Sequence, residues 1–240
     1  MKPPYHSPHI KVPNASRGCV PSSDCHLIVF ARAPVPGEVK TRLAVFMGAS
    51  AAARLYESML LRTLSTAVHS RAGIVELWVT PSKKHPFFNL CAEDFPLTLH
   101  LQTTGDLGRR MAHAFQETLK ETRFALLLGT DSPSLTQGDL NEAAAALRQG
   151  NDAVLGPTED GGYCLIGLRR YASRLFDDIS WGTPLVLEQT RARLRELAWS
   201  WRELPERWDV DRPEDVDRLK SEGYLTVSEQ LPNMHSHIKK

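Results

Sequence analysis

Three basic side chains, Arg32, Lys40 and Arg42, lie in a proline-rich segment directly after the apolar run 27–30. The segment reads Phe30-Ala-Arg-Ala-Pro-Val-Pro-Gly-Glu-Val-Lys-Thr-Arg-Leu43. Its prolines give no N–H to a sheet, so a strand has to end there, and Gly37 lets the backbone turn tightly or approach a ligand. A basic loop at the carboxyl end of a strand suits a di- or triphosphate. The same residues are equally consistent with a solvated surface loop.

A carboxylate follows a second apolar run. Residues 124–128 are continuously apolar, which is typical of a strand buried on both faces, and Gly129-Thr-Asp-Ser-Pro133 comes directly after it. Asp131 is therefore expected at the same edge of the sheet as Lys40. Mg²⁺ is commonly held by one or two carboxylates together with phosphate oxygens, so Asp131 is a candidate metal ligand. The alternative is that Asp131 caps a turn or a short helix.

Two later segments also combine carboxylates with turn residues. In Gly156-Pro-Thr-Glu-Asp-Gly-Gly-Tyr163, the pair Gly161 and Gly162 predicts a sharp bend or a close approach to a ligand, although Asp-Gly is also a common hairpin turn. In Trp208-Asp-Val-Asp-Arg-Pro-Glu-Asp215, Asp209 and Asp211 point to one side of an extended chain and repel unless a cation joins them. Asp211 is also a natural cap for a helix starting near Pro213, so capping accounts for one of the two aspartates.

Composition excludes several classes of protein. The chain has 240 residues, 42% apolar and 24% charged, which is typical of a globular protein with a core. Its formal net charge of +1 gives no global field for nucleic acid, and no apolar stretch reaches the roughly 20 residues of a membrane span. The cysteines at 19, 25, 91 and 164 form no C-x-x-C pair, which favours reduced thiols and a cytoplasmic protein.

The pattern of the chain predicts one α/β domain between two tails. Residues 1–26, rich in Pro, Ser and His, are expected to be a flexible leader, residues 27–228 the domain, and residues 229–240 a flexible tail. His235 and His237 in the tail could touch a metal, but a solvated tail explains them more simply. The sequence leaves the oligomeric state open.

Apolar runs alternate with helical patterns through the domain. Strands are predicted at 27–31, 74–80, 97–102, 124–129, 153–156 and 163–168, and helices at 51–68, 107–122, 137–148, 183–197 and 213–221. This alternation predicts a mostly parallel sheet with helices on both faces. Six or seven strands are expected, and the later ones are expected to be partly antiparallel because their spacing shortens after residue 150.

The motifs together resemble those of the DUF2064 family, which is associated with glycosyltransferase-like proteins and, in some members, with arsenosugar biosynthesis. The resemblance extends from about residue 27 to residue 223. It rests on the first basic segment, on Gly105-Asp-Leu-Gly-x-Arg-Met111, Gly129-Thr-Asp-Ser-Pro133, Gly156-Pro-x-x-Asp-Gly-Gly-Tyr163, Leu165-Ile-Gly-Leu168 and Trp181-Gly-Thr183. It implies the nucleotide-diphospho-sugar transferase (GT-A) fold, which is Rossmann-like.

The resemblance also implies roles for individual residues. Molybdenum-cofactor and phospholactate guanylyltransferases and the cytidylyltransferase of isoprenoid synthesis are similar at the Gly-Thr-Asp and late Asp-x-Asp elements. By that similarity Asp131 and Asp211 hold a divalent metal, Mg²⁺ or Mn²⁺. The implied nucleotide and phosphate contacts are Arg32, Gly37, Lys40, Arg42, Gly105, Asp106 and Gly108. The implied catalytic residues are Asp160 and Lys40, and Gly161, Gly162 and Trp181 are implied at the sugar or acceptor, although a tryptophan is more often part of a core.

The sequence departs from these relatives at three places. The first loop lacks the Leu-Ala-Gly-Gly pattern of nucleotidylyltransferases, Ser132 and Pro133 follow Asp131 where many glycosyltransferases have a second aspartate, and Arg109 replaces an acidic residue. The preferred hypothesis is a metal-dependent glycosyltransferase that moves a sugar from a nucleoside-diphosphate donor to a small acceptor. The alternatives are a guanylyl- or cytidylyltransferase that releases pyrophosphate and a non-catalytic nucleotide-binding protein.

Overall fold

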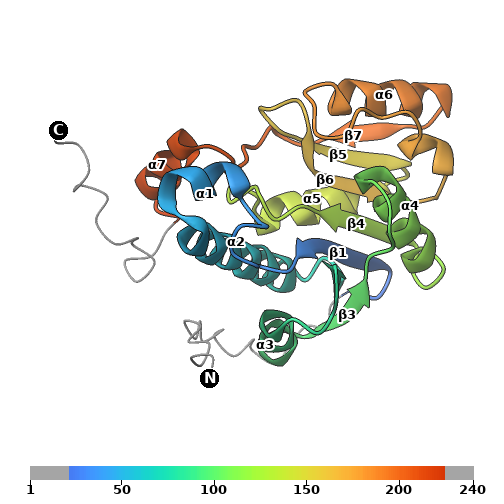
Figure 1. Ribbon diagram of the computed structural model, residues 1–240. Coiled ribbons are helices and arrows are strands. Elements are labelled where there is room, and N and C mark those ends of the chain that lie inside the picture. The colour runs from blue at the N-terminus through green and yellow to red at the C-terminus, as the bar shows by residue number, and fades with distance from the viewer. Residues whose placement is uncertain (1–21, 225–240) are drawn as a thin grey trace, which may run out of the picture.

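The computed structural model describes residues 22–224, which form a seven-stranded sheet with helices on both faces (Figure 1). The strands are β1 (Cys25–Arg32), β2 (Ile74–Thr80), β3 (Leu97–Leu101), β4 (Phe124–Leu128), β5 (Ala153–Pro157), β6 (Tyr163–Leu168) and β7 (Trp201–Glu203). Their order across the sheet is β3-β2-β1-β4-β6-β5-β7. Strand β6 pairs antiparallel with both of its neighbours, and the other pairings are parallel. The predicted mixed sheet is therefore confirmed.

The helices belong to two layers and one end of the sheet. They are α1 (Thr41–Met47), α2 (Ala49–Ser70), α3 (Pro86–Asp94), α4 (Leu107–Thr118), α5 (Gln137–Arg148), the 3₁₀ helix η1 (Ser173–Phe176), α6 (Val186–Glu196) and α7 (Pro213–Ser221). Helices α2, α3 and α5 pack on one face, and α4, η1 and α6 pack on the other. A separate cluster joins α1, α2 and α7, which lie together at one end of the molecule in Figure 1.

Strand β1 shows why this sequence needs two helical layers. Leu27 and Val29 belong to one hydrophobic cluster, while Ile28 and Phe30 belong to the cluster on the opposite face. Side chains alternate along a strand, so a continuously apolar strand has to be covered on both sides. Strand β4 is likewise buried at all of its five positions. These two central strands carry the loops that the sequence singles out.

Four chain segments meet at one edge of the sheet because of this topology. The parallel strands β1, β4, β5 and β7 all end there, and the antiparallel β6 begins there. The loop 33–40, the loop 129–136, the hairpin 158–162 and the segment 204–212 follow these strand ends. Open α/β sheets bind their ligands at this edge.

Several expected boundaries differ from the structure. Strand β1 begins at Cys25, inside the range expected to be a leader, and α6 begins at Val186 rather than at residue 183. Helices α1 and α3 and strand β7 are additional elements. The tail 229–240, with His235 and His237, lies outside the described residues. Cys25, Cys91 and Cys164 are buried free thiols, and burial raises the pKa of each to about 12.

Among the helices of residues 22–224, none combines the length and the apolar character that a bilayer crossing requires.

Candidate active site

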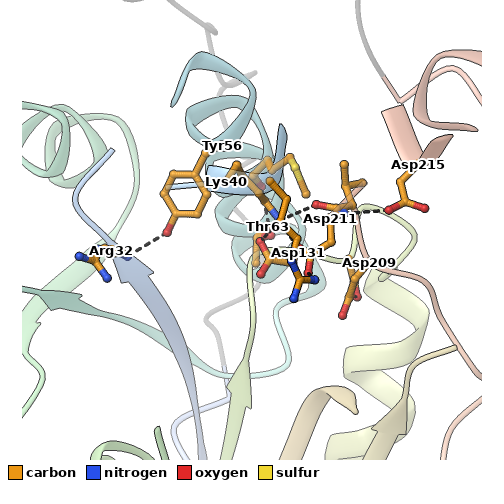
Figure 2. A network of polar contacts seen from close by, with 12 residues as sticks. Arg32, Lys40, Tyr56, Thr63, Asp131, Asp209, Asp211 and Asp215 are labelled. Carbon is orange, nitrogen blue, oxygen red and sulfur yellow. Dashed lines mark hydrogen bonds and ion pairs between the residues drawn. The ribbon is translucent and has the colours of Figure 1, made fainter. Parts of the chain in front are cut away.

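The ammonium group of Lys40 joins two of the loops at the carboxyl edge (Figure 2). Lys40 Nζ lies 2.6 Å from Asp131 Oδ1 and 3.2 Å from Asp211 Oδ1, and it donates a hydrogen bond to the Val210 carbonyl at 2.6 Å. The Val210 N–H in turn donates to the Asp131 carbonyl at 2.9 Å. The structure therefore brings together the lysine and both carboxylates that the sequence singled out, although they are far apart in the chain.

Lys40 is held at this position by its backbone and by its burial. Its φ of 47° and ψ of 45° place it in the left-handed region, where it stands immediately before α1. Its side chain is 4% exposed, whereas those of Asp131 and Asp211 are each 47% exposed. Burial opposes the charge of the ammonium group, but the two carboxylates outweigh burial and raise the pKa of Lys40 above its usual value.

Asp211 does not cap α7, and that prediction is wrong. The carboxylate of Asp215, in the first turn of α7, accepts hydrogen bonds from the Asp211 N–H at 2.9 Å and the Arg212 N–H at 2.7 Å. The Asp211 side chain instead faces Lys40, and its Oδ2 lies 3.5 Å from Arg42 Nη1. The Asp215 carboxylate, four residues further along, satisfies these N–H groups at the helix start, which leaves the Asp211 side chain available for the site.

Asp209 is a partly buried neighbour of this cluster. It accepts a hydrogen bond from the Ser132 hydroxyl, which follows Asp131 directly. Burial raises the pKa of the Asp209 carboxyl to about 7, with the negative charges of Asp131 and Asp160 adding to the effect. The two aspartates of the Asp-x-Asp segment therefore differ in their surroundings, because Asp211 contacts a lysine and Asp209 a hydroxyl.

Two cavities open at this edge and share a boundary. The smaller has a volume of about 370 Å³ and the larger about 820 Å³. Five residues line both of them, namely Phe30, Arg42, Leu107, Asp131 and Asp211. The carboxylate pair thus lines both cavities, at the place where they adjoin.

The smaller cavity is lined by basic side chains from three elements. Arg32, at the end of β1, pairs with Glu38 at 3.4 Å, and its backbone N–H donates to the Tyr56 hydroxyl at 2.8 Å (Figure 2). Arg110 in α4 donates to the Gln102 side-chain oxygen at 3.0 Å. Burial, with the nearby charge of Arg32, lowers the pKa of the Arg110 guanidinium. Lys40 and Arg42 also line this cavity.

The hairpin between β5 and β6 forms one wall of the larger cavity. The Asp160 carboxylate accepts hydrogen bonds from the Thr158 hydroxyl at 2.6 Å and from the Gly162 N–H at 3.0 Å. Gly161 has a φ of +84°, and a Cβ there would lie 2.3 Å from the Pro184 carbonyl oxygen. The hairpin interpretation is thus confirmed, and Asp160, Gly161 and Gly162 also line the cavity.

Trp181 forms a second wall of the larger cavity and packs on α4. A Cβ added to Gly108 would lie 2.5 Å from the indole Nε1 of Trp181. Gly108 is buried, and the indole packs directly against its Cα, where the side chain of any other residue would lie. Trp181 is only partly buried and lines the cavity as well as packing against the core.

The remaining predicted residues lie outside the linings of the two cavities. Gly37 has a φ of +86° with open space beside it, and Gly105 has a φ of +119°. Asp106 caps α4 by accepting from the Arg109 N–H at 2.8 Å. These residues shape the loops, and their predicted ligand contacts stay predictions.

Sequence reasoning did not select four residues that line the cavities, namely Tyr56, Gln102, Arg110 and Thr130. Arg110 lies in the motif Gly105-Asp-Leu-Gly-x-Arg-Met111. Its positive charge in the first turn of a predicted helix was the signal that could have identified it. Tyr56 lies in the middle of a helix among other apolar residues, so no local pattern marks it. Asp209 was noticed as the partner of Asp211 but was not selected.

The donor atoms at the boundary suit a hard divalent cation. Asp131 and Asp211 have half-exposed side chains whose carboxylates already converge on one positive charge. Mg²⁺ is often held by one or two carboxylates plus phosphate oxygens and water, so two protein ligands are sufficient. Within residues 22–224, no group of three or more His, Cys, Asp or Glu side chains is arranged to hold a metal ion. The residues therefore fit a cation whose remaining ligands come from a substrate.

Comparison with protein families gives one match. Residues 63–183 match the model of DUF2064, described as "uncharacterized protein conserved in bacteria". No protein of curated function matches the chain.

Comparison with solved structures gives several matches. A protein of Desulfovibrio desulfuricans G20, provisionally described as a nucleotide-diphospho-sugar transferase, is 29% identical over 88% of this chain and 92% of its own, with a TM-score of 0.77. A cytidylyltransferase of Leptospira borgpetersenii is 16% identical over 87% and 90% of the two chains, with a TM-score of 0.53. The 4-diphosphocytidyl-2C-methyl-D-erythritol synthase of Anaerococcus prevotii is 9% identical over 83% and 96%, with a TM-score of 0.54. The last two likenesses show a shared fold.

Proposed function

Because the chain belongs to the DUF2064 family and has the fold of nucleotide-diphospho-sugar transferases, we propose that it is a glycosyltransferase. Its donor is a nucleoside-diphosphate sugar and its acceptor a small molecule. One observation carries the proposal: Lys40, Asp131 and Asp211 meet where a basic cavity adjoins a larger one. A donor lying across this boundary has its diphosphate beside the basic side chains and its sugar in the larger cavity.

Charge neutralisation is the main contribution of the smaller cavity. A diphosphate leaving group gains negative charge as its bond to the sugar breaks, and stabilising such charge is usually a large part of catalysis. Arg32, Arg42 and Arg110 are placed to contact it. Lys40 lines the same cavity, but its ammonium group mainly holds the two carboxylates together.

A divalent cation, Mg²⁺ or Mn²⁺, would be held by Asp131 and Asp211, and when bound it supplies further positive charge to the diphosphate. Asp160 lies in the turn between β5 and β6 and lines the larger cavity. It is proposed to orient the acceptor hydroxyl or to take its proton. Gly161 and Gly162 keep this wall free of side chains beside the sugar.

The first experiment is a thermal-shift screen of nucleoside diphosphates and sugar nucleotides with and without Mn²⁺. We expect Mn²⁺ to increase the stabilisation given by one sugar nucleotide, and turnover with an acceptor to release a nucleoside diphosphate. Release of pyrophosphate from a nucleoside triphosphate, with no turnover of sugar nucleotides, would instead identify a nucleotidylyltransferase. Nucleotide binding that is indifferent to metal would count against both reactions.

Asp131→Asn tests the proposed metal ligand. Asparagine keeps an oxygen for Lys40, so the melting temperature should change little, whereas the metal-dependent part of nucleotide binding should be lost. Asp94→Asn is the matched control because Asp94 is exposed at the end of α3 and lies outside both cavity linings. Calorimetry of the two variants with Mn²⁺ distinguishes them, and unchanged metal dependence in Asp131→Asn would exclude Asp131 as a ligand.

A further inference from the structure

The two cavities differ in the charges that line them. The smaller is lined by four basic side chains (Arg32, Lys40, Arg42, Arg110) and three acidic ones (Glu38, Asp131, Asp211). The larger is lined by two basic side chains (Arg42, Arg212) and five acidic ones (Asp131, Glu159, Asp160, Asp209, Asp211). A ligand that reaches from one cavity into the other therefore moves from a basic lining to an acidic one.

Three of these five carboxylates already have a basic partner, and a fourth is partly buried beside a hydroxyl. Asp131 and Asp211 contact Lys40, Glu159 lies 3.0 Å from Arg218, and Asp209 accepts from Ser132. Asp160 is different, because its contacts are the neutral Thr158 hydroxyl and the Gly162 N–H. No lysine, arginine or histidine of residues 22–224 lies within ion-pair distance of Asp160. Asp160 is exposed and lines the larger cavity with a negative charge that has no basic partner among these residues.

The basic side chains of the larger cavity offer little to an anion there. Arg42 belongs to the boundary and faces Asp211. The side chain of Arg212 is 70% exposed and lies 3.9 Å from Glu214. Phosphate and carboxylate groups are usually recognised by arginines that are held to form paired hydrogen bonds. The part of this cavity away from the boundary has no such arginine among the described residues.

The rest of the larger cavity suits an uncharged ring. Its apolar lining includes Met111, Ile166 and the indole of Trp181, which Gly108 holds in place. Small-molecule sites are commonly apolar with a few polar groups that fix the orientation of the ligand. A sugar-sized molecule with hydroxyl groups can lay its C–H face on the indole and direct a hydroxyl to Asp160.

We infer that the larger cavity takes, beside the sugar of the donor, an acceptor that is hydroxylated, of sugar size, and free of phosphate and carboxylate groups, being either neutral or positively charged. This inference rests on the proposed function and adds the chemical class of the acceptor. The donor diphosphate then occupies the smaller cavity, and a second anion on the acceptor would meet Asp160. Like charges brought together at an interface cost enough to select against a wrong partner.

Four sugars that share one pyranose frame test the inference. They are D-glucose, which is neutral, D-glucosamine, a cation, D-glucuronate, an anion, and D-glucose 6-phosphate, a dianion. Each is titrated into the full chain with Mn²⁺ and the nucleoside diphosphate that stabilises the chain best in the nucleotide screen, and binding is followed by tryptophan fluorescence. We expect glucose and glucosamine to bind at least about tenfold more tightly than the two anions.

A pair of variants identifies the source of this selectivity. Asp160→Asn keeps an oxygen for Thr158 and Gly162 but removes the charge, so the ratio between neutral and anionic sugars should fall, whereas Asp94→Asn should preserve it. Tighter binding of glucose 6-phosphate than of glucose, or binding of none of the four sugars, would overturn the inference. The proposed function is tested by a different result: it would be wrong if no nucleotide or sugar nucleotide stabilised the protein in the nucleotide screen, whatever the four sugars do.

Discussion

Lys40 is the residue on which the candidate site most depends, and the structure changes what its removal should do. From sequence it was a phosphate contact on an exposed loop. In the structure its side chain is 4% exposed and its ammonium group separates two carboxylates. A buried cation that joins two anions is costly to remove, because the anions are then left to repel each other.

We expect Lys40→Met to lower the free energy of unfolding by about 1–3 kcal/mol, less than for a fully buried pair because Asp131 and Asp211 can regain water. Mn²⁺ should stabilise this variant more than it stabilises the unmodified protein, because a divalent ion can replace the lost positive charge. Melting curves with and without Mn²⁺ measure both effects. Lys120→Met, which removes an exposed lysine of a surface pair, is the control, and an equal response of the two variants to Mn²⁺ would contradict the prediction.

Gly108 illustrates a residue that acts through its neighbour. We expect Gly108→Ala to destabilise the protein by about 1–3 kcal/mol, because the new Cβ overlaps the indole of Trp181. The displaced indole should also weaken binding in the larger cavity, seen as a higher KM for the acceptor with a smaller change in kcat. Gly138→Ala in α5 is the control, because its Cβ meets only the Thr136 hydroxyl oxygen at an ordinary 3.5 Å. Unchanged acceptor KM in Gly108→Ala would show that Trp181 is only part of the core.

Local patterns predicted part of this site and missed part of it. Asp131 was identified because it follows an apolar run, Lys40 because it lies in a basic, proline-rich segment, and Asp211 because it alternates with Asp209, and the family resemblance implied their roles. Tyr56 reaches the site from the interior of a helix, so only the packing of α2 against β1 reveals it. The capping role of Asp211 was predicted wrongly because Arg212 occupies the cap position of α7, and the Asp215 carboxylate accepts from the Asp211 and Arg212 N–H groups.

At the scale of elements, a buried polar network joins β1, β2 and α4 behind the site. Glu76 accepts hydrogen bonds from the Trp78 indole N–H at 2.7 Å and the Thr118 hydroxyl at 3.0 Å, and it lies 2.5 Å from His26 Nδ1. Burial opposes the charge of Glu76, but these partners outweigh burial and lower the pKa of its carboxyl. The network fixes α4, which carries Gly108 and Arg110, against the sheet.

Glu76→Gln should therefore cost about 1–3 kcal/mol of unfolding free energy, because one buried partner loses its acceptor. The loss should shrink as the pH falls. A lowered carboxyl pKa contributes stability that is present above the unfolded pKa and is lost as the pH falls through the folded pKa. Urea denaturation at pH 7 and pH 4 measures both values. A larger loss at pH 4 than at pH 7 would contradict this account.

The elements themselves were largely predictable from the sequence. Continuous apolar runs identified β1 and β4, because only strands covered on both faces need such runs. Helix α3 was not predicted, although Pro86 lies in its first turn and His85 caps it. Its nine residues are too few to show a clear helical repeat of apolar residues. Strand β7 has three residues, which is too short for an alternating pattern.

For the whole molecule, the buried Glu57 of α2 predicts the pH dependence of stability. Burial raises the pKa of its carboxyl from 4.5 to about 7 in the folded protein. Between these two values the unfolded chain ionises while the folded chain stays protonated, so this residue lowers stability as the pH rises and its penalty is complete above about pH 7. Glu57→Gln should leave the melting temperature unchanged near pH 4 and raise it at pH 8, where the free energy of unfolding should increase by up to about 3 kcal/mol. Equal effects at the two pH values would contradict the assignment.

The arrangement of the whole sheet was less accessible than its parts. Alternating strands and helices predicted a mostly parallel sheet, and shortened spacing predicted the antiparallel β6. The order of strands could not be predicted, because it depends on which apolar faces pack together rather than on any one segment. That order nevertheless decides that the loops after β1 and β4 and the segment after β7 meet.

The shared boundary of the two cavities has a practical consequence for inhibitor design. Fragments selected separately for each cavity would both lie beside Asp131 and Asp211, so a short linker could join them. Tethering turns the second binding event into an intramolecular one, and a well-matched linker can raise affinity by about 10²–10⁴. The linings favour an inhibitor with a diphosphate-like group for the smaller, basic cavity and a neutral or cationic group for the larger, acidic cavity.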